Sequence, residues 1–139
     1  MIKTMKIKVG RNGFVPQRAY PSDAGLDLFS PVSLVIPAGG IEIIDTEVSS
    51  AIPVGFVGLI TSKSGLMAAG ITSRGTIDSS YRGTIKAVLY NNSKEDYSVQ
   101  RGDKITQLVL LPIITPELEI VSELDDTDRG NGGFGSTGK

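Results

Sequence analysis

Short stretches of alternating hydrophobic and polar residues recur along this chain, and they predict β-strands. Near the N-terminus, Ile7 and Val9 alternate with Lys6 and Lys8, a pattern typical of a half-buried strand. Asp27 lies inside another short apolar stretch. Further strands are expected at Val32–Ile36, Ile41–Asp45, Phe56–Thr61, Thr84–Asn91 and Lys104–Leu111. Because turn-forming residues separate these stretches, the spacing predicts an all-β, jelly-roll-like fold.

Two segments depart from the strand pattern. A short helix is expected at Gly65–Ala69, with Ser64 as its N-cap. From Asp125 onward the sequence becomes glycine-rich, and such a segment cannot bury enough apolar surface to order itself. We therefore expect a β-rich domain over residues 1–124 and a flexible arm over residues 125–139. The arm is either a free tail or a segment that orders over a ligand.

Composition restricts the partners that the chain can have. The 139 residues include 14 basic and 15 acidic side chains, and the net charge of -1 gives no global attraction for nucleic acid or an acidic membrane surface. No apolar run approaches the roughly 18 residues of a spanning helix. The N-terminus lacks the apolar core of a signal peptide, so a cytosolic protein is expected, or one of the host cytosol or nucleus if the chain is viral.

The absence of two residue types restricts the chemistry. There is no Cys, which excludes disulfides and thiolate nucleophiles, and no His, which removes the commonest general base. Acid–base chemistry must therefore rest on Asp or Glu, with Lys or Tyr as less common alternatives. A bound metal would be a hard cation held by oxygen atoms, such as Mg²⁺.

The stretch from Gly75 to Gly83 concentrates reactive groups. Asp78 precedes Tyr81 by three residues, and a predicted strand follows at once. An acid held at the mouth of a sheet is placed to remove a proton from a ligand. The same residue types also mark an ordinary turn, and this stretch alone does not decide between the two.

Three other features have both a ligand-binding and a structural interpretation. The segment from Thr61 to Leu66 has a cation and hydroxyls at a predicted helix start, which suits phosphate, or simply a Ser cap beside a solvated Lys. Gln107 lies among apolar residues of a predicted strand and must bond either to backbone or to a ligand. Asp27 poses the same question. Residues 101–103, Arg-Gly-Asp, are expected to form a hairpin turn.

Five segments occur in an order that resembles the signature motifs of the homotrimeric dUTP diphosphatases, or dUTPases. They cover nearly the whole chain, and five motifs in order are far more specific than one. The segments are Asp23–Leu28, Ser62–Leu66, Gly75–Gly83, Arg101–Leu108 and Arg129–Gly138.

The resemblance implies hydrolysis of dUTP to dUMP and pyrophosphate with Mg²⁺, a reaction that keeps uracil out of DNA. It implies that Asp78 is the general base that activates the attacking water. Tyr81 would pack on the deoxyribose, and the backbone of Gly75, Thr76 and Ile77 would hydrogen-bond uracil.

The resemblance also implies a homotrimer whose active sites are shared between subunits. Lys63, Ser64 and Gly65 would contact phosphates from a neighbouring subunit. Gln107 would hold the α-phosphate or the water, and Asp27 would reach the metal through a coordinated water. In the arm, Phe134 would cover the uracil ring, and the residues that close around the γ-phosphate would be Arg129, Gly135, Ser136 and Thr137.

The chain departs from the family pattern in three places. Lys63 stands where the family usually has Arg, which replaces a bidentate grip by a point charge. Ser80 stands where an acid is common, and the hairpin expected between Gly70 and Asp78 is shorter than usual. Two alternatives therefore stay open, namely an enzyme like dCTP deaminase and a catalytically idle trimer that binds a nucleotide or a partner.

Overall fold

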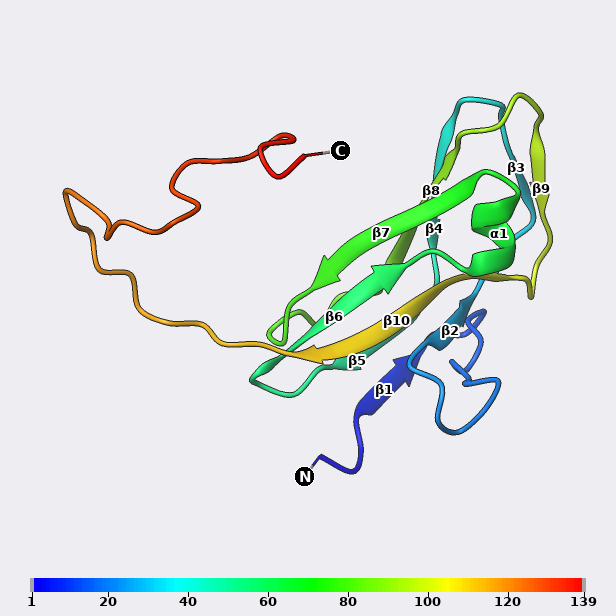
Figure 1. Cartoon of the computed structure of the whole chain (residues 1–139). Helices are drawn as coiled ribbons and strands as arrows, with labels where there is room; N and C mark the ends of the chain where they lie inside the picture. Colours follow the sequence, from blue (N-terminus) through cyan, green and yellow to red (C-terminus); the bar gives the residue numbers. More distant parts are fainter. Residues whose placement is uncertain (1, 139) are drawn as a thin grey trace.

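The computed structural model describes residues 2–138, which form ten strands and one short helix. Figure 1 shows the strands gathered into one body, with the C-terminal segment running away from it. The elements are β1 (Lys6–Val9), β2 (Leu26–Phe29), β3 (Leu34–Ile36), β4 (Ile41–Asp45), β5 (Val48–Ala51), β6 (Phe56–Thr61), α1 (Ser64–Ala68), β7 (Ile71–Ile77), β8 (Lys86–Asn91), β9 (Tyr97–Val99) and β10 (Lys104–Pro112).

The strands pair in antiparallel fashion, and neighbours in a sheet are often distant in the sequence. Six of them form one curved sheet in the order β2-β10-β6-β7-β8-β4, while β1 pairs with β5 and β3 pairs with β9. This arrangement confirms the predicted all-β, jelly-roll-like fold. No helix within residues 2–138 is long and apolar enough to cross a membrane.

Apolar stretches bounded by turn-forming residues were the ones that the sequence predicted well. The bounds of β4 and β6 match the prediction, whereas β3 and β8 each start two residues later than expected. Strands β5 and β9 were missed, because Val-Ser-Ser-Ala and Tyr-Ser-Val are short and hydroxyl-rich. Each of them forms because a partner strand supplies its hydrogen bonds, β1 for β5 and β3 for β9.

Two hairpin predictions were wrong. Residues 71–77 form a single strand, β7, and no hairpin. The Arg-Gly-Asp segment does turn, with Gly102 at a φ of 91° and its N–H donating to Ser30 O. It is no hairpin, however, because β9 pairs with β3 whereas β10 pairs with β2 and β6.

The core consists of two apolar clusters on the inner faces of the strands. One centres on Ile36, Ile44, Leu89 and Ile105, and the other on Leu28, Ile60, Ile85 and Leu108. At Gly58 in β6, an added Cβ would lie 2.5 Å from Ile52 Cδ1 and 2.7 Å from Leu108 Cδ1. A glycine is therefore needed there for β6 to pack on the core.

Residues beyond β10 contain no strand or helix up to Gly138. The last backbone hydrogen bond to the body runs from Ile113 N–H to Gly55 O. Beyond it, several large apolar side chains are exposed, namely Ile114, Leu118, Ile120, Leu124 and Phe134. The division into residues 1–124 and 125–139 stays a prediction, and its end residues Met1 and Lys139 lie outside the described residues.

Candidate functional site

Strand β7 changes its partner halfway along, and this change opens a cleft. Residues 71–73 pair with β8, whereas residues 74–77 pair with β6. The edge of Gly75, Thr76 and Ile77 that faces β8 therefore has no ladder partner. The cleft beside this edge is lined by Ile60, Arg74, Gly75, Thr76, Ile77, Asp78, Tyr81, Thr84, Lys86 and Val88. Backbone groups on such an edge can hydrogen-bond a flat ligand as a neighbouring strand would.

Asp78 is the first residue after β7 and begins a tight turn. The Tyr81 N–H donates to Asp78 O at 3.1 Å, and Arg82 Nη1 donates to Ser79 O at 2.6 Å, so the turn is braced. The Asp78 side chain is exposed and makes no hydrogen bond or ion pair with residues 2–138. The turn interpretation and the reactive-acid interpretation are thus compatible: the turn holds an unengaged carboxylate at the cleft.

Tyr81 is fixed against the same turn. Its hydroxyl donates to Thr84 O at 2.9 Å, while 40% of the residue is exposed. Gly83 allows this position, because a Cβ there would lie 2.3 Å from the Tyr81 hydroxyl oxygen. The ring therefore presents an apolar surface to the cleft in a defined orientation.

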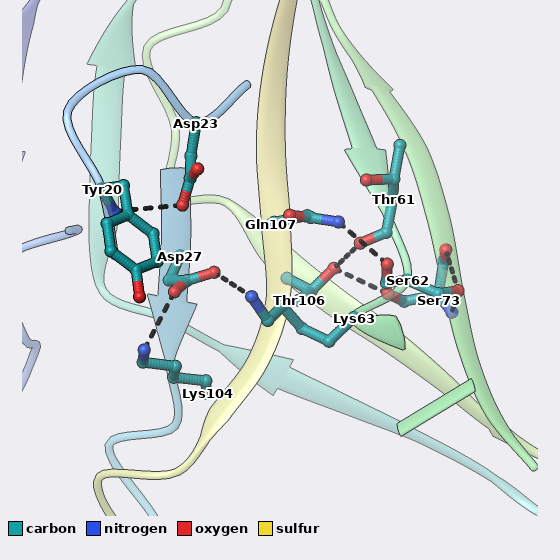
Figure 2. Close-up of polar contacts among 10 residues, drawn as sticks. All are labelled: Tyr20, Asp23, Asp27, Thr61, Ser62, Lys63, Ser73, Lys104, Thr106 and Gln107. Atoms are coloured by element: carbon teal, nitrogen blue, oxygen red, sulfur yellow. Dashed lines mark hydrogen bonds and ion pairs between the residues drawn. The ribbon is translucent and has the colours of Figure 1, made fainter. Parts of the chain in front are cut away.

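A second group of predicted residues surrounds Asp27, far from Asp78. Its side chain is 3% exposed and is paired with two lysines: Lys63 Nζ lies 2.5 Å from Oδ1 and Lys104 Nζ lies 3.1 Å from Oδ2. Figure 2 shows the two ammonium groups approaching the carboxylate from different sides. The buried Asp27 carboxylate is thus paired with two lysine side chains. The sequence had left open whether it bonds to backbone or to a ligand.

Gln107 adjoins this group on β10, opposite Asp27 on β2 and Thr61 on β6. Its Nε2 donates to Ser62 O at 3.0 Å, so this amide bonds to backbone. Gly25 makes room for the side chain, because an added Cβ at this position would overlap Gln107 Oε1. The Nε2 group of Gln107 therefore holds the backbone at Ser62.

Buried hydroxyls hold the chain where β6 leaves the sheet for α1. Ser73 Oγ and Thr106 Oγ1 are 2.6 Å apart, which joins β7 to β10, the two strands on either side of β6 (Figure 2). Thr106 Oγ1 also donates to Thr61 O, and the Ser73 N–H donates to Ser62 Oγ at 2.8 Å. This network fixes Ser62, and with it the start of the Lys63 segment.

Helix α1 starts one residue earlier than predicted, and the expected Ser64 cap was wrong. The cap position falls on Lys63, whose backbone is extended with φ -73° and ψ 135° and whose side chain makes no cap hydrogen bond. Lys63 instead directs its ammonium group to Asp27. Ser64 and Gly65 follow as exposed residues of the first turn.

The arm residues lie apart from both groups. Arg129 Nε donates to Gly132 O at 3.0 Å, and the Ser136 N–H donates to Gly133 O at 3.1 Å, so the arm forms small local turns. Phe134 has a φ of 47° and is fully exposed. Gly135, Ser136 and Thr137 follow it in a turn, and Figure 1 shows the C-terminal end of the chain lying away from the strands.

The predicted residues therefore fall into three separate groups within one chain. Ile77 pairs with Gly58, five residues before Lys63, which places Asp78 roughly 15–20 Å from Lys63 at the usual strand rise. The cleft beside β7 contains neither Lys63 nor Gln107. A single chain does not bring the Asp78 group, the Asp27 group and the arm together.

Sequence reasoning missed several residues in these groups. Lys104 belongs to a motif segment, yet nothing in the sequence shows that it pairs with Asp27, 77 positions earlier. Arg74 and Lys86 line the cleft and were not singled out. The one available signal was a cation on the exposed face of a strand close to the predicted acid Asp78.

The described residues offer limited protein ligands for a metal ion. Within residues 2–138 no three acidic side chains come together as a metal cage. Asp27 is the carboxylate that pairs with Lys63 and Lys104, and Gln107 lies opposite it on β10. This donor set fits a Mg²⁺ ion that takes most of its ligands from water and substrate phosphates.

Comparison with known proteins identifies close likenesses. The family model for dUTPase matches residues 11–138 of the chain. The chain is 44% identical over 131 residues to the deoxyuridine 5'-triphosphate nucleotidohydrolase of Candida albicans, covering 91% of this chain and 82% of that protein. It is also 44% identical to the protein of the same name from Paramecium bursaria Chlorella virus 1, with 94% of each chain covered.

Solved structures show the same likeness in three dimensions. A Staphylococcus bacteriophage 80alpha dUTPase with dUpNHpp superimposes with a TM-score of 0.92 at 31% identity, covering 99% of this chain and 100% of that chain. A mutant dUTPase from phage phi11 of S. aureus, described for its coordination of a structural Mg(II) ion, gives a TM-score of 0.81 at 31% identity. That match covers 87% of this chain and 98% of that chain.

Proposed function

We propose that this chain, which belongs to the dUTPase family, hydrolyses dUTP to dUMP and pyrophosphate with Mg²⁺. The observation that carries the proposal is the cleft beside β7. There the unpaired edge of Gly75, Thr76 and Ile77 meets the unengaged carboxylate of Asp78 and the ring of Tyr81. A cytosolic location, or the host cytosol or nucleus for a viral chain, goes with this function.

Asp78 acts as the general base. Its exposed carboxylate accepts a proton from a water molecule as the water oxygen bonds to phosphorus and the α–β phosphoanhydride bond breaks. The leaving group is pyrophosphate. In a chain without His, and within residues 2–138, Asp78 is the acid that the fold leaves unpaired at the cleft.

Uracil binds along the unpaired edge of β7. The backbone N–H and C=O groups of Gly75, Thr76 and Ile77 satisfy its polar edge, and a cytosine amino group or a thymine methyl group would leave a donor unpaired or clash. Tyr81 packs on the deoxyribose. Its hydroxyl is held by Thr84 O. In this position the ring would exclude a 2′-hydroxyl.

The triphosphate is bound by a different set of groups. Lys63, Ser64 and Gly65 contact the phosphates, and Gln107 holds the α-phosphate or the attacking water. Asp27 would hold a phosphate-bound Mg²⁺ through a water molecule, and the ion would supply charge neutralisation on the leaving group. Support for this division comes from the exposure of Ser64 and Gly65 and from the position of Gln107 beside Ser62.

The complete site is shared within a homotrimer. Support comes from the separation of Asp78 from Lys63, because the two groups of one chain lie too far apart to contact one substrate molecule together. The segment after β10 gives further support, because Leu118 and Ile120 are 91% and 96% exposed and alternate with Glu117 and Glu119. Such a strand-like pattern needs a partner that a second copy supplies.

The arm closes over the bound nucleotide. Phe134 covers the uracil ring, while Arg129, Gly135, Ser136 and Thr137 surround the γ-phosphate. Closure excludes water from the site other than the attacking molecule, as mobile lids do in other enzymes. The full exposure of Phe134 supports this role, because a large aromatic side chain without contacts is available to cover a ligand.

One assay tests the proposal against its alternatives. We expect the purified chain with Mg²⁺ to release pyrophosphate from dUTP and to leave dCTP and dTTP largely intact. Release of ammonia from dCTP would instead identify an enzyme like dCTP deaminase. Tight binding of dUpNHpp without any release of pyrophosphate from dUTP would identify a catalytically idle trimer.

A further inference from the structure

The Asp27 carboxylate is shared by two lysines, one on each oxygen. Lys63 occupies Oδ1 at 2.5 Å and Lys104 occupies Oδ2 at 3.1 Å (Figure 2). Asp27 makes no other side-chain hydrogen bond within residues 2–138, and its side chain is 3% exposed. Within residues 2–138, these two ammonium groups alone therefore compensate the negative charge of the buried carboxylate.

The two lysines are held differently by the fold. Lys104 is the first residue of β10, which pairs directly with the β2 strand that carries Asp27. Lys63 lies between the end of β6 and α1, in the segment that the proposed function assigns to phosphate binding. Both side chains are partly exposed, 27% for Lys63 and 46% for Lys104, so neither is enclosed by the fold.

The Lys63 ammonium group cannot pair equally well with Asp27 and with a substrate phosphate at the same time. Its flexible stem allows the ammonium group to move between two anions. If it left an otherwise unpaired Asp27, a buried charge would lose its only partner, which is strongly unfavourable. Lys104 removes this obstacle, because Asp27 keeps one ammonium group when Lys63 moves away.

We propose that Lys104 is a positioning residue for phosphate binding: it stays on Asp27 and so releases Lys63 to the phosphate chain of the substrate. This inference rests on the proposed function, in which Lys63 binds phosphate. Lys104 itself does not touch the substrate. Its contribution is to lower the free-energy cost of moving the Lys63 ammonium group from the Asp27 carboxylate to a phosphate.

The test compares Lys104→Met with Lys104→Arg, and Lys94→Met serves as the control. Lys94 is an exposed lysine in the β8–β9 loop, so its substitution removes one charge without touching Asp27. Affinities for dUpNHpp and for deoxyuridine, which has no phosphate, are measured by calorimetry in EDTA. Without metal, a change in Mg²⁺ binding cannot account for the result.

We expect Lys104→Met to weaken dUpNHpp binding about tenfold, within the usual range for coupled sites. Deoxyuridine binding should not change, Lys104→Arg should restore the affinity, and Lys94→Met should behave as wild type. In an Asp27→Asn background, Lys104→Met should have no further effect, because Lys63 is then no longer held. Equal weakening in that background would mean that Lys104 contacts phosphate directly, and this would overturn the proposal.

Two further results would also overturn it, namely an unchanged dUpNHpp affinity in Lys104→Met and an equal loss for deoxyuridine. Thermal unfolding identifies variants that do not fold. If Lys104→Met is among them, Lys104→Gln takes its place, with the same expected direction and the same overturning results. A wild type that binds inorganic tripolyphosphate but fails to hydrolyse dUTP would refute the proposed function alone, and the comparison can then be run with tripolyphosphate.

Discussion

Asp27 and Asp78 are both carboxylates, yet the fold places them in opposite environments. Asp27 is 2% exposed and carries an ammonium group on each oxygen, whereas Asp78 is exposed and unpaired within residues 2–138. A paired, buried acid positions its neighbours, while a free acid at a cleft can take a proton. The surroundings of each residue therefore separate their roles more clearly than the residue type does.

Replacing Asp78 by Asn tests the role of the free acid. The amide keeps the shape of the side chain but cannot accept the proton of the attacking water. We expect kcat for dUTP to fall by about 10²–10⁴, the usual contribution of a general base, with little change in dUpNHpp affinity. Steady-state kinetics and calorimetry measure the two quantities. A near-normal kcat would remove Asp78 from the mechanism.

At the scale of elements, β7 is the strand that the rest of the cleft depends on. It pairs with β8 over residues 71–73 and with β6 over residues 74–77, and the change of partner leaves its second half with an open edge. The hydroxyls of Ser73 and Thr106 join β7 to β10 near this change. The same strand therefore belongs to the sheet at one end and to the ligand cleft at the other.

Strand β6 supports β7 over the cleft, and its packing depends on Gly58. We expect Gly58→Val to lower the free energy of unfolding by about 1–3 kcal/mol, because the new side chain would overlap the buried Ile52 and Leu108. Chemical denaturation measures the change. Gly133→Val is the control, since a Cβ at Gly133 would meet nothing within 4 Å. Equal stability of both variants would show that the core has room at Gly58.

How well the sequence predicted these elements depended on how local their cause was. Apolar stretches bounded by turn residues predicted β4 and β6, and the motif segments predicted Asp78, Tyr81 and Lys63 as site residues, which stays a prediction. The strand β7 was mistaken for a hairpin because Arg-Gly interrupts its apolar pattern. The pairing of Lys104 with Asp27 could not be predicted, because it depends on β10 lying beside β2.

At the scale of the whole molecule, one chain carries the parts of the proposed site but does not assemble them. The Asp78 cleft, the Asp27 group and the arm are separate, and the apolar residues beyond β10 are exposed. A trimer with shared sites explains both facts at once. The proposed trimer would bring the groups together and cover the exposed segment.

Truncation after Asp128 separates the arm's proposed role from that of the body. Within residues 2–138 the hydrogen bonds of the arm are all local, so we expect the shortened chain to fold and to sediment as the same trimer as the full chain. Without the residues that cover the substrate, kcat/KM for dUTP should fall by about 10²-fold, as when a positioning group is lost. A monomeric product would mean that the arm acts in assembly, which contradicts the role proposed for it.

Complementation between inactive variants tests the shared site most directly. Asp78→Asn and Lys63→Met chains are each assayed alone and then after co-refolding in equal amounts. If Asp78 and Lys63 of one site come from different subunits, mixed trimers contain some intact sites, and we expect about a quarter of wild-type activity from random assembly. If both residues act from the same chain, every site in the mixture is defective. Activity that stays at the level of the separate variants would therefore contradict the account.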